Sequence, residues 1–328
     1  MTGDRQRPGV VVPPKDAGSQ SPSTAQPLAA TASREVGRDV LAAAERGHKT
    51  RTFHALGYSF ALRSPDPVVV ELFEELYAPC AAAGLPDCWY SIVPAGVGSP
   101  EQDLVVDARW LVRVDRPSRV LRYLTWHVNH QVISRSARYV LLHASAAEKD
   151  GVGVLLPGGP EAGKTTLVAG LVRSGFGYLT DEAAALHPET LEIEPYPKPL
   201  SIDPGSWSIL ADLAPHRGAA TEAYFEGQWQ VNPATVRPDA VSGRALPALV
   251  IFPRYVRGSG TELVRVPRAE ALVTMMQHTF HFHDRGRRNL DVLARLLRNS
   301  TCYRLTSGDL AEACRQITSL IERETAKD

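Results

Sequence analysis

The residues of this chain with the clearest chemical potential lie in one glycine-rich run, residues 158–166, which reads GGPEAGKTT. It satisfies the phosphate-loop pattern through Gly158, Gly163, Lys164 and Thr165. In such a loop the glycines let backbone N–H groups converge on phosphate oxygens, and the next helix adds the partial positive charge of its N-terminus. Lys164 would bind the outer phosphates, and the Thr165 hydroxyl would bind Mg²⁺. The run therefore predicts a site for nucleotide phosphates, made of Gly158, Gly159, Pro160, Glu161, Ala162, Gly163, Lys164, Thr165 and Thr166.

The flanks of this run supply the elements that a phosphate loop requires. The apolar stretch 151–157 predicts a strand before the loop, and residues 167–173 predict a helix after it. Asp150-Gly151 separates that strand from an earlier apolar stretch, 139–147, and Asp-Gly between two such stretches is typical of a hairpin. A glycine-rich loop without a ligand is the alternative, but this order of elements favours nucleotide binding.

Two neighbouring carboxylates, Asp181 and Glu182, are the candidates for the second half of the site. Phosphoryl transfer needs carboxylates near the metal ion and the γ-phosphate. The pair directly follows a short apolar strand, 176–180, which comes one helix after Lys164. We expect this strand to bring the pair back beside the loop, although an acidic pair in this position is otherwise a surface turn.

Two common classes of phosphate-loop protein are excluded by the motifs that the sequence lacks. A GTPase would carry Asn-Lys-x-Asp and an ABC-type ATPase would carry Leu-Ser-Gly-Gly-Gln, and neither occurs. Residues 178–182 imitate the Walker-B pattern of motor ATPases, but they follow on the very next strand after the loop. Motor ATPases insert further strands and helices before that pattern, so the spacing indicates a different lineage.

Four stretches together resemble the catalytic domain of HPr kinase/phosphorylase: 142–145, 151–156, 158–166 and 175–182. The chain is more similar still to the HPr-kinase-related proteins that accompany peptide natural-product gene clusters. Those proteins share a His-Ala element before the loop, an Asp-Glu after it and a Pro-x-Pro-Lys/Arg-Pro-x-Ser segment, which is matched here by residues 195–201. The resemblance implies an α/β fold, namely a P-loop kinase of the HPr kinase and phosphoenolpyruvate carboxykinase type.

The resemblance also implies roles for single residues. Lys164 matches the loop lysine of the family and Thr165 its metal-binding Ser/Thr. Asp181 matches the residue thought to accept the substrate hydroxyl proton, Glu182 the residue near the metal, and His143 a histidine on the strand before the loop. HPr kinases have Asp-Asp where this chain has Asp-Glu, which leaves the metal geometry open. Their Arg-Gly segment, tied to phosphorylase activity, has no clear counterpart, and this argues against the reverse reaction.

For the other candidate site residues, a role without ligand binding explains the sequence as well as, or better than, a functional role. Lys198 is a clamp on the transferring phosphate or a solvated lysine, and Arg254, at the end of an apolar strand, would face a nucleotide or substrate phosphate. His278, His281 and His283 are spaced like metal ligands, but a surface cluster is favoured. Four aromatic residues either line a substrate cleft or pack their own segment, namely Trp207, Tyr224, Phe225 and Trp229.

The chain divides into three predicted parts. Residues 1–50 form a disordered tail, because the Pro- and Ser-rich stretch 1–32 cannot bury enough apolar surface to offset its ordering entropy. Residues 51–137 mix helical and strand patterns and predict a smaller α+β N-terminal domain. Residues 138–328 carry every candidate residue and predict the catalytic domain.

Within these parts we expect the following elements. The strands are 53–62, 89–93, 104–114 with a hairpin around Asp107-Ala108, 183–186 and 191–193 as a hairpin, 246–253, 263–266 and 302–305. The helices are 34–46, 68–83, 119–136, 268–279, 290–298 and 310–321, and 206–245 is a loop-rich excursion.

Composition excludes several function classes. The 36 basic and 36 acidic side chains cancel, so neither a nucleic acid nor an acidic membrane surface is expected as a partner. The four cysteines lack metal-ligand spacing and are expected to be free thiols. The chain has no apolar run long enough for a membrane span and no signal-peptide pattern at its N-terminus, which together predict a cytoplasmic location.

These observations favour an ATP- and Mg²⁺-dependent kinase that phosphorylates a hydroxyl. The expected acceptor is a serine of a peptide or protein, or else a small alcohol, and homo-oligomer formation is left open. A P-loop ATPase or nucleotide switch without an acceptor is the second hypothesis. A module that binds nucleotide without turnover is the third, and the intact Lys164, Thr165 and Asp181 argue against it.

Overall fold

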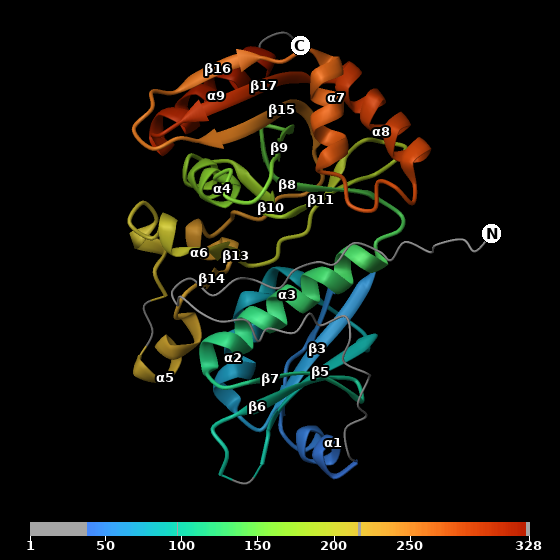
Figure 1. Cartoon of the computed structure of the whole chain (residues 1–328), viewed down its shortest axis with the longest axis vertical. Coiled ribbons are helices and arrows are strands. Elements are labelled where there is room, and N and C mark those ends of the chain that lie inside the picture. Colours follow the sequence, from blue (N-terminus) through green and yellow to red (C-terminus); the bar gives the residue numbers. More distant parts are fainter. Residues whose placement is uncertain (1–37, 97, 216–217, 326–328) are drawn as a thin grey trace, which may run out of the picture.

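A computed structural model gives the structure of residues 38–96, 98–215 and 218–325. They form two units, with residues 38–137 below and the later residues above in Figure 1. Both units contain sheets covered by helices, so the predicted mixed α/β character is confirmed. Residues 1–37 of the tail predicted over 1–50 lie outside the described residues, as does the start of the helix predicted over 34–46. The end of the predicted tail is wrong, because residues 38–50 contain α1 (Arg38–Glu45) and a strand, His48–Lys49, that pairs with Arg63 and Ser64.

The N-terminal unit is built on a sheet that has seven strands within the described residues. Their order is β4-β2-β3-β5-β6-β7, with β1 also paired to β3, and β3 and β5 run parallel. Helices α2 (Pro67–Leu76) and α3 (Pro117–Arg135) pack on one face of the sheet, and α1 packs on the other. The strands are β1 (His48–Lys49), β2 (Thr52–Ala55), β3 (Tyr58–Ser64), β4 (Ala81–Ala82), β5 (Cys88–Pro94), β6 (Gln102–Val106) and β7 (Arg109–Val114).

The C-terminal unit is built on a sheet that has eight strands in the part of the chain that the structure describes. Their order is β12-β11-β8-β9-β15-β17-β16, with β10 also paired to β8. The neighbours β9, β15 and β17 run parallel, and ligands of such sheets bind beyond the carboxyl ends of the parallel strands. The strands are β8 (Val140–Lys149), β9 (Val152–Pro157), β10 (Gly177–Thr180), β11 (Ala183–Leu186), β12 (Ile193–Glu194), β15 (Leu246–Tyr255), β16 (Glu262–Arg265) and β17 (Thr301–Ser307).

Helices cover both faces of this second sheet. α4 (Lys164–Arg173) and α9 (Leu310–Thr325) lie on one face, and α7 (Arg268–Gln277) and α8 (Gly286–Asn299) lie on the other (Figure 1). A Cβ atom added to Gly170 would come within 2.7 Å of Leu310 Cδ1 and 2.9 Å of Cys314 Sγ. The absence of a side chain at this glycine therefore lets α4 and α9 approach closely.

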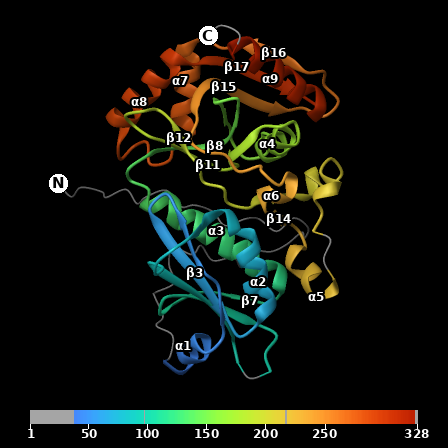
Figure 2. The ribbon, with the colours of Figure 1, turned by 180° about the vertical axis from the view of Figure 1, so that it is seen from behind.

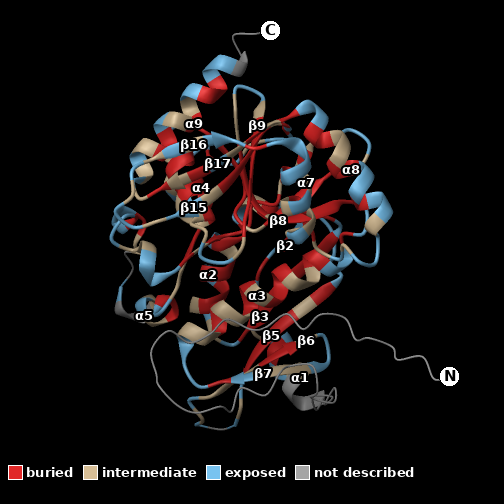
Figure 3. Cartoon of the chain, turned by 45° about the horizontal axis from the view of Figure 1, so that its top comes forward, coloured by how far each residue is buried: buried red, intermediate tan, exposed pale blue. Residues whose placement is uncertain are grey.

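The two units share one apolar core. Leu141 of β8 and Ala183 of β11 are buried in the same cluster as the N-terminal sheet and α3. Their neighbours Leu142 and Ala184 point the other way, into the cluster beneath α7 and α8. Figure 3 shows buried residues running from the strands of one unit through α3 to those of the other. The alternation of side chains along β8 thus ties the C-terminal sheet to the N-terminal unit.

A long excursion after β13 (Leu200–Ile202) bridges the two units, as the view from behind shows (Figure 2). Tyr224 Oη donates to Asp66 at 2.9 Å, and Asn232 Nδ2 donates to the carbonyl of Glu75 at 2.6 Å. The region predicted to be loop-rich contains only short elements. These are η2 (Pro204–Ser206), η3 (Ala211–Leu213), α5 (Ala219–Glu222), η4 (Ala223–Phe225), β14 (Trp229–Val231) and α6 (Pro233–Val236).

The predicted β-hairpins form as expected. Asp150 and Gly151 both have positive φ, 53° and 80°, in the turn between β8 and β9. Asp107, with φ 54°, turns the chain between β6 and β7. The hairpin of β11 and β12 also forms.

Two predictions in the N-terminal unit are wrong. The stretch 53–62 is not one strand but the hairpin of β2 and β3, because Leu56 and Gly57 take left-handed φ of 49° and 93°. The helix predicted over 68–83 ends at Leu76, and the chain continues as η1 (Ala78–Cys80) and β4. Pro79 has no N–H to extend the helical hydrogen bonds, and it disfavours helical backbone at the residue before it.

Candidate functional site

The glycine-rich loop connects β9 to α4, as its pattern predicts. Gly163 precedes the first residue of α4 with φ 86°, a conformation that costs glycine little. A Cβ atom at Gly158 would lie 3.1 Å from the Cβ of Ala162, so the loop folds tightly on itself. Lys164 Nζ donates to the carbonyl of Gly159 at 2.8 Å, which holds the lysine side chain over the loop.

Lys164 is a buried cation at the start of a helix, with 8% of its surface exposed. Burial lowers the pKa of its ammonium, and the negative charges of Glu182 and Asp181 oppose this effect. A buried ammonium stays charged only where negative groups compensate for its lost hydration. The loop therefore presents a positive charge that the phosphates of a ligand would stabilise further.

Asp181 and Glu182 lie at a break in the sheet beside this loop. β10 and β11 follow one another along the same edge of β8, and the acidic pair lies between the two strands, just after a shift of the pairing register between Tyr178 and Thr180. Its main chain is fixed to β8, since Ser145 Oγ donates to the Asp181 carbonyl at 2.8 Å and the Ala144 N–H donates to the Glu182 carbonyl at 3.1 Å. Such irregularities redirect side chains and are common near functional sites.

Asp181 is buried, with 3% of its surface exposed, and its carboxylate is held by three groups. Lys198 Nζ donates to Oδ1 at 2.7 Å, Tyr178 Oη donates to the same oxygen at 3.2 Å, and the Ser201 N–H donates to Oδ2 at 3.2 Å. Lys198 is equally buried and also donates to the carbonyl of Pro199 at 2.8 Å. Lys198 is therefore not the solvated lysine considered from sequence, because its buried ammonium is the partner of Asp181. Its role as a clamp on the transferring phosphate stays a prediction.

The pKa of Lys198 reflects two opposed influences. Burial, the larger single influence, lowers it, but the carboxylates of Asp181 and Glu182 together outweigh burial and raise the pKa above its usual value. Lys198 is therefore an ammonium at neutral pH. Glu182 is the accessible member of the acidic pair, because 40% of its side chain is exposed and its Oε2 lies 3.5 Å from Lys198 Nζ.

His143 of β8 lies near Lys164 and His278 and is neutral at physiological pH. Burial, with the nearby charges of Lys164 and His278, lowers its pKa to about 4. Its backbone accepts from the Gly158 N–H at 3.3 Å and donates to the carbonyl of His278 at 2.6 Å. His278 also approaches the loop, since a Cβ at Gly159 would lie 3.9 Å from its ring. The backbone of His143 thus helps to position the glycine-rich loop.

Acidification is expected to destabilise the fold through two histidines. Burial lowers the pKa of both His127 and His143 to about 4, whereas the unfolded chain has the usual value of about 6.5. Between these values the unfolded chain binds protons that the folded histidines do not, so the free energy of unfolding should fall as pH drops from about 6.5 to 4. Urea unfolding over that range should show a shallower fall for His143→Gln than for the wild type. The exposed His48→Gln serves as control, and equal slopes for both variants would contradict the assignment.

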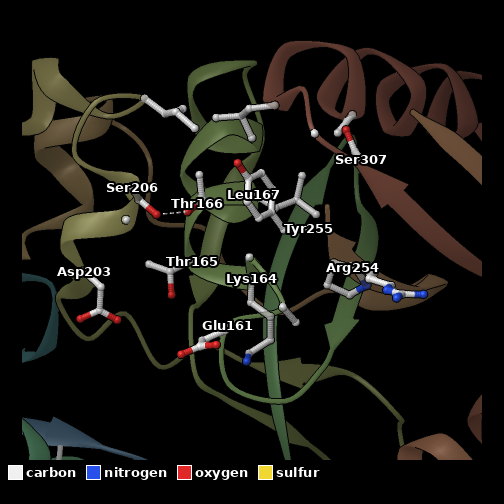
Figure 4. Close-up of a pocket in the computed structure, with 18 of the residues that line it drawn as sticks. Glu161, Lys164, Thr165, Thr166, Leu167, Asp203, Ser206, Arg254, Tyr255 and Ser307 are labelled. Atoms are coloured by element: carbon white, nitrogen blue, oxygen red, sulfur yellow. Dashed lines mark hydrogen bonds between the residues drawn. The ribbon is translucent and has the colours of Figure 1, made fainter. Parts of the chain in front are cut away.

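A cavity of about 320 Å³ lies beside the loop, beyond the carboxyl ends of β9, β15 and β17. Figure 4 shows Lys164, Thr165 and Glu161 at one end of it and the ring of Tyr255 further along, beside Leu167 and Thr166. Of the predicted site residues, Glu161 to Thr166 and Arg254 line this cavity. Asp181, Glu182, Lys198 and His143 are not among its lining residues and form a second group beside Lys164.

Several cavity residues escaped prediction from sequence. Asp203 and Ser206 follow β13, Tyr255 ends β15, and Asp309 precedes α9. No motif marks them, and they reach the cavity only because the excursion and the carboxyl ends of the strands converge on it. The one available signal was topological, since segments that follow parallel strands are expected near a ligand.

Arg254 lines the cavity, but its side chain extends away from Lys164 in Figure 4. Trp207 and Trp229 stack at 4.8 Å between ring centroids, and Tyr224 and Phe225 join the core of the N-terminal unit. The four aromatic residues left open from sequence thus pack the excursion. His281 lies near Asp284, with 3.6 Å between Nδ1 and Oδ2.

Oxygen atoms suited to Mg²⁺ gather at the loop end of the cavity. Thr165, Glu161 and Asp203 all line this end, and their oxygens face the same space in Figure 4. Within the described ranges, no three or more His, Cys, Asp or Glu side chains are grouped closely enough to hold a metal by themselves. Mg²⁺ usually takes one or two carboxylates together with waters and substrate phosphates, so this set fits an ion that arrives with a nucleotide.

Comparison with known proteins adds little. Neither a family model nor a curated protein matches the sequence. Among solved structures the chain is similar to the HPr(Ser) kinase/phosphatase from Coxiella burnetii, with 16% identity, a TM-score of 0.30, and coverage of 57% of this chain and 97% of that chain. None of the helices in the described ranges is long and apolar enough to cross a membrane.

Proposed function

We propose that this protein is an ATP- and Mg²⁺-dependent kinase that transfers the γ-phosphate to a hydroxyl group. The observation that carries the proposal is the position of Lys164. It is a buried lysine at the N-terminus of α4, with an oxygen-lined cavity on one side and the Asp181–Glu182–Lys198 cluster within electrostatic reach. Phosphoryl transfer requires such a concentration of charge far more than covalent chemistry from the protein.

In this proposal the loop and Lys164 hold the phosphates through backbone N–H groups and one ammonium. Thr165 would hold Mg²⁺ together with Glu182, which lies outside the cavity lining but within electrostatic reach of Lys164, and Glu161 and Asp203 are further carboxylates on the cavity wall. Bound Mg²⁺ neutralises charge on the transferring phosphate. Positioning and charge stabilisation would then supply most of the rate acceleration.

Asp181 would accept the proton of the acceptor hydroxyl. Its Oδ1 is occupied by Lys198 and Tyr178, whereas Oδ2 accepts, among the residues that the structure describes, one hydrogen bond, from the Ser201 N–H. A carboxylate oxygen can accept more than one hydrogen bond, so Oδ2 retains capacity for the acceptor hydroxyl. His143, neutral at pH 7, would support the site as a positioning residue beside Gly158.

We propose a serine of a peptide or protein as the acceptor, with a small alcohol as the alternative. A P-loop ATPase without an acceptor is the competing function. One observation favours it, namely the greater exposure of Glu182. Glu182 is the exposed carboxylate, and a water molecule would reach it more readily than it would reach Asp181. The two functions assign opposite roles to the pair, which makes them separable by substitution.

Glu182→Gln tests this choice. If Glu182 holds the metal, the variant should lose about tenfold in ATP affinity with Mg²⁺ present and nothing without it, because one charge-assisted contact is worth about 1.5–3 kcal/mol. The exposed side chain predicts little change in melting temperature. Titrating labelled ATP with and without Mg²⁺ measures both affinities, and the exposed Glu189→Gln is the control. Tight Mg²⁺-dependent binding with slow hydrolysis would instead favour the ATPase.

A further inference from the structure

The end of the cavity that is distant from Lys164 has a different chemistry from the loop end. Its walls are apolar and come from three separate segments: Ile209 of the excursion, Tyr255 of β15, and Leu310 and Ala313 of α9. Ile209 and Tyr255 are among the large hydrophobic side chains that remain exposed, and half of the Tyr255 surface faces solvent. Exposed apolar residues gathered in a concave site are typical of ligand binding.

We propose that this end binds the nucleobase, with the ring of Tyr255 as its stacking surface. The inference rests on the proposed function, because it takes the phosphates to lie on the glycine-rich loop. In Figure 4 the Tyr255 ring stands between Thr166 and Ser206 on one side and Ser307 on the other. A base beside Tyr255 would therefore continue from phosphates held by Lys164.

Tyr255 is fixed relative to the phosphate loop. Tyr255 is the last residue of β15, where it pairs with Ser307 of β17. A Cβ atom added to Gly163 would lie 3.3 Å from the Cβ of Tyr255, so the first side-chain carbon of the tyrosine lies directly against the residue that precedes α4. The distance between the stacking ring and the phosphate site is thus set by backbone contacts and not by a flexible loop.

The two remaining walls are held equally firmly. Thr166 and Ser206 share a hydrogen bond of 2.6 Å, which joins the excursion to α4. At the start of α9, a Cβ added to Gly308 would lie 2.7 Å from the carbonyl of Val256, so this turn packs directly on the backbone after β15. A rigid slot with apolar walls loses little entropy when a planar ring enters it.

The polar groups around this end do not select one base. The Thr166 and Ser206 hydroxyls are bonded to each other, and the Ser307 hydroxyl is bonded to Thr261 and to the backbone of Asp309, so these groups are not arranged to read the edge of one particular base. Recognition by stacking uses the π face that every base has. The site therefore takes nucleoside triphosphates as a class, with the ring of Tyr255 supplying affinity.

The test compares ATP with inorganic tripolyphosphate, which has the phosphates but no base. Tyr255→Ala should weaken ATP binding about tenfold and leave tripolyphosphate binding unchanged, because stacking on an aromatic side chain is worth about 1–3 kcal/mol. Tyr255→Phe keeps the ring and should retain ATP affinity. Isothermal titration with Mg²⁺ present gives these affinities, and the melting temperature shows that each variant is folded.

Three other outcomes have distinct meanings. If Tyr255→Ala leaves both affinities unchanged, the base lies elsewhere and the inference is wrong. If both affinities fall equally, Tyr255 acts on the phosphate loop through Gly163, and the inference is again wrong. If the wild type binds neither ligand, the proposed function itself fails, and the base site fails with it.

Discussion

Replacing Lys164 by alanine is expected to weaken ATP binding by about 10- to 150-fold without destabilising the fold. A hydrogen bond from an ammonium to phosphate is worth about 1.5–3 kcal/mol, and each 1.4 kcal/mol is about tenfold in affinity. The ammonium makes one hydrogen bond within the described residues, to the Gly159 carbonyl, and its pKa is lowered mainly by burial. Removing a buried cation of this kind should leave the melting temperature unchanged or slightly higher.

Two variants control this experiment. Lys164→Met keeps the methylene stem, which lies beside Gly158, and should lose ATP affinity as fully as Lys164→Ala. Lys49→Ala removes an exposed lysine of the N-terminal unit and should bind ATP normally. Affinities from isothermal titration and melting temperatures from calorimetry decide the outcome. Unchanged ATP affinity in a folded Lys164→Ala would contradict the phosphate-loop assignment.

The local parts of the site could be predicted from sequence because short motifs specify them. The strand, the loop and the helix around Lys164 follow from glycine spacing and apolar periodicity. The turn at Asp150-Gly151 follows from the preference of these residues for left-handed φ. The same rule failed at Leu56-Gly57, where leucine takes a left-handed φ that its side chain does not favour.

The long-range parts could not be predicted, since no local pattern determines them. Lys198 lies in a proline-rich segment that is 17 residues after Asp181 in the chain, and only the folded structure brings its ammonium to that carboxylate. Asp203 and Tyr255 enter the cavity from two segments that meet through the tertiary fold. Sequence reasoning singled out Asp181 and Lys198 separately, but it could not pair them.

Breaking the ion pair between Asp181 and Lys198 is expected to lower both the stability and the activity of the protein. Both side chains are almost fully buried, with 2.7 Å between Nζ and Oδ1. Asp181→Asn leaves the ammonium with the neutral Pro199 carbonyl at 2.8 Å and one carboxylate, that of Glu182, at 3.5 Å. Lys198→Met leaves the Asp181 carboxylate with Tyr178 and Ser201. Losing one partner of a buried ion pair costs about 3–5 kcal/mol, so each variant should lose that much free energy of unfolding.

The double variant Asp181→Asn, Lys198→Met removes both charges together. Since neither charge is then left unpaired, it should lose less stability than the sum of the two single variants, and urea unfolding of all four proteins gives the coupling energy. Strict additivity would mean that the ion pair does not stabilise the fold. Lys198→Met should keep ATP affinity near that of the wild type, whereas a lysine that clamps the phosphate would lose it.

Activity separates the kinase from the ATPase in the same set of variants. As the base for an acceptor hydroxyl, Asp181 would contribute about 10²–10⁴ in rate, so Asp181→Asn should bind ATP with Mg²⁺ almost normally and fail to transfer phosphate. As the metal ligand of an ATPase, Asp181 would be needed for the Mg²⁺-dependent binding of ATP itself.

ATP titrations with and without Mg²⁺, made below the melting temperature of each variant, distinguish these results before an acceptor is known. Loss of Mg²⁺-dependent binding in Asp181→Asn, beside a tightly binding and hydrolytically slow Glu182→Gln, would overturn the kinase assignment. We expect the reverse, because the carboxylate that solvent and a metal ion can reach is that of Glu182, while Asp181 is held by Lys198.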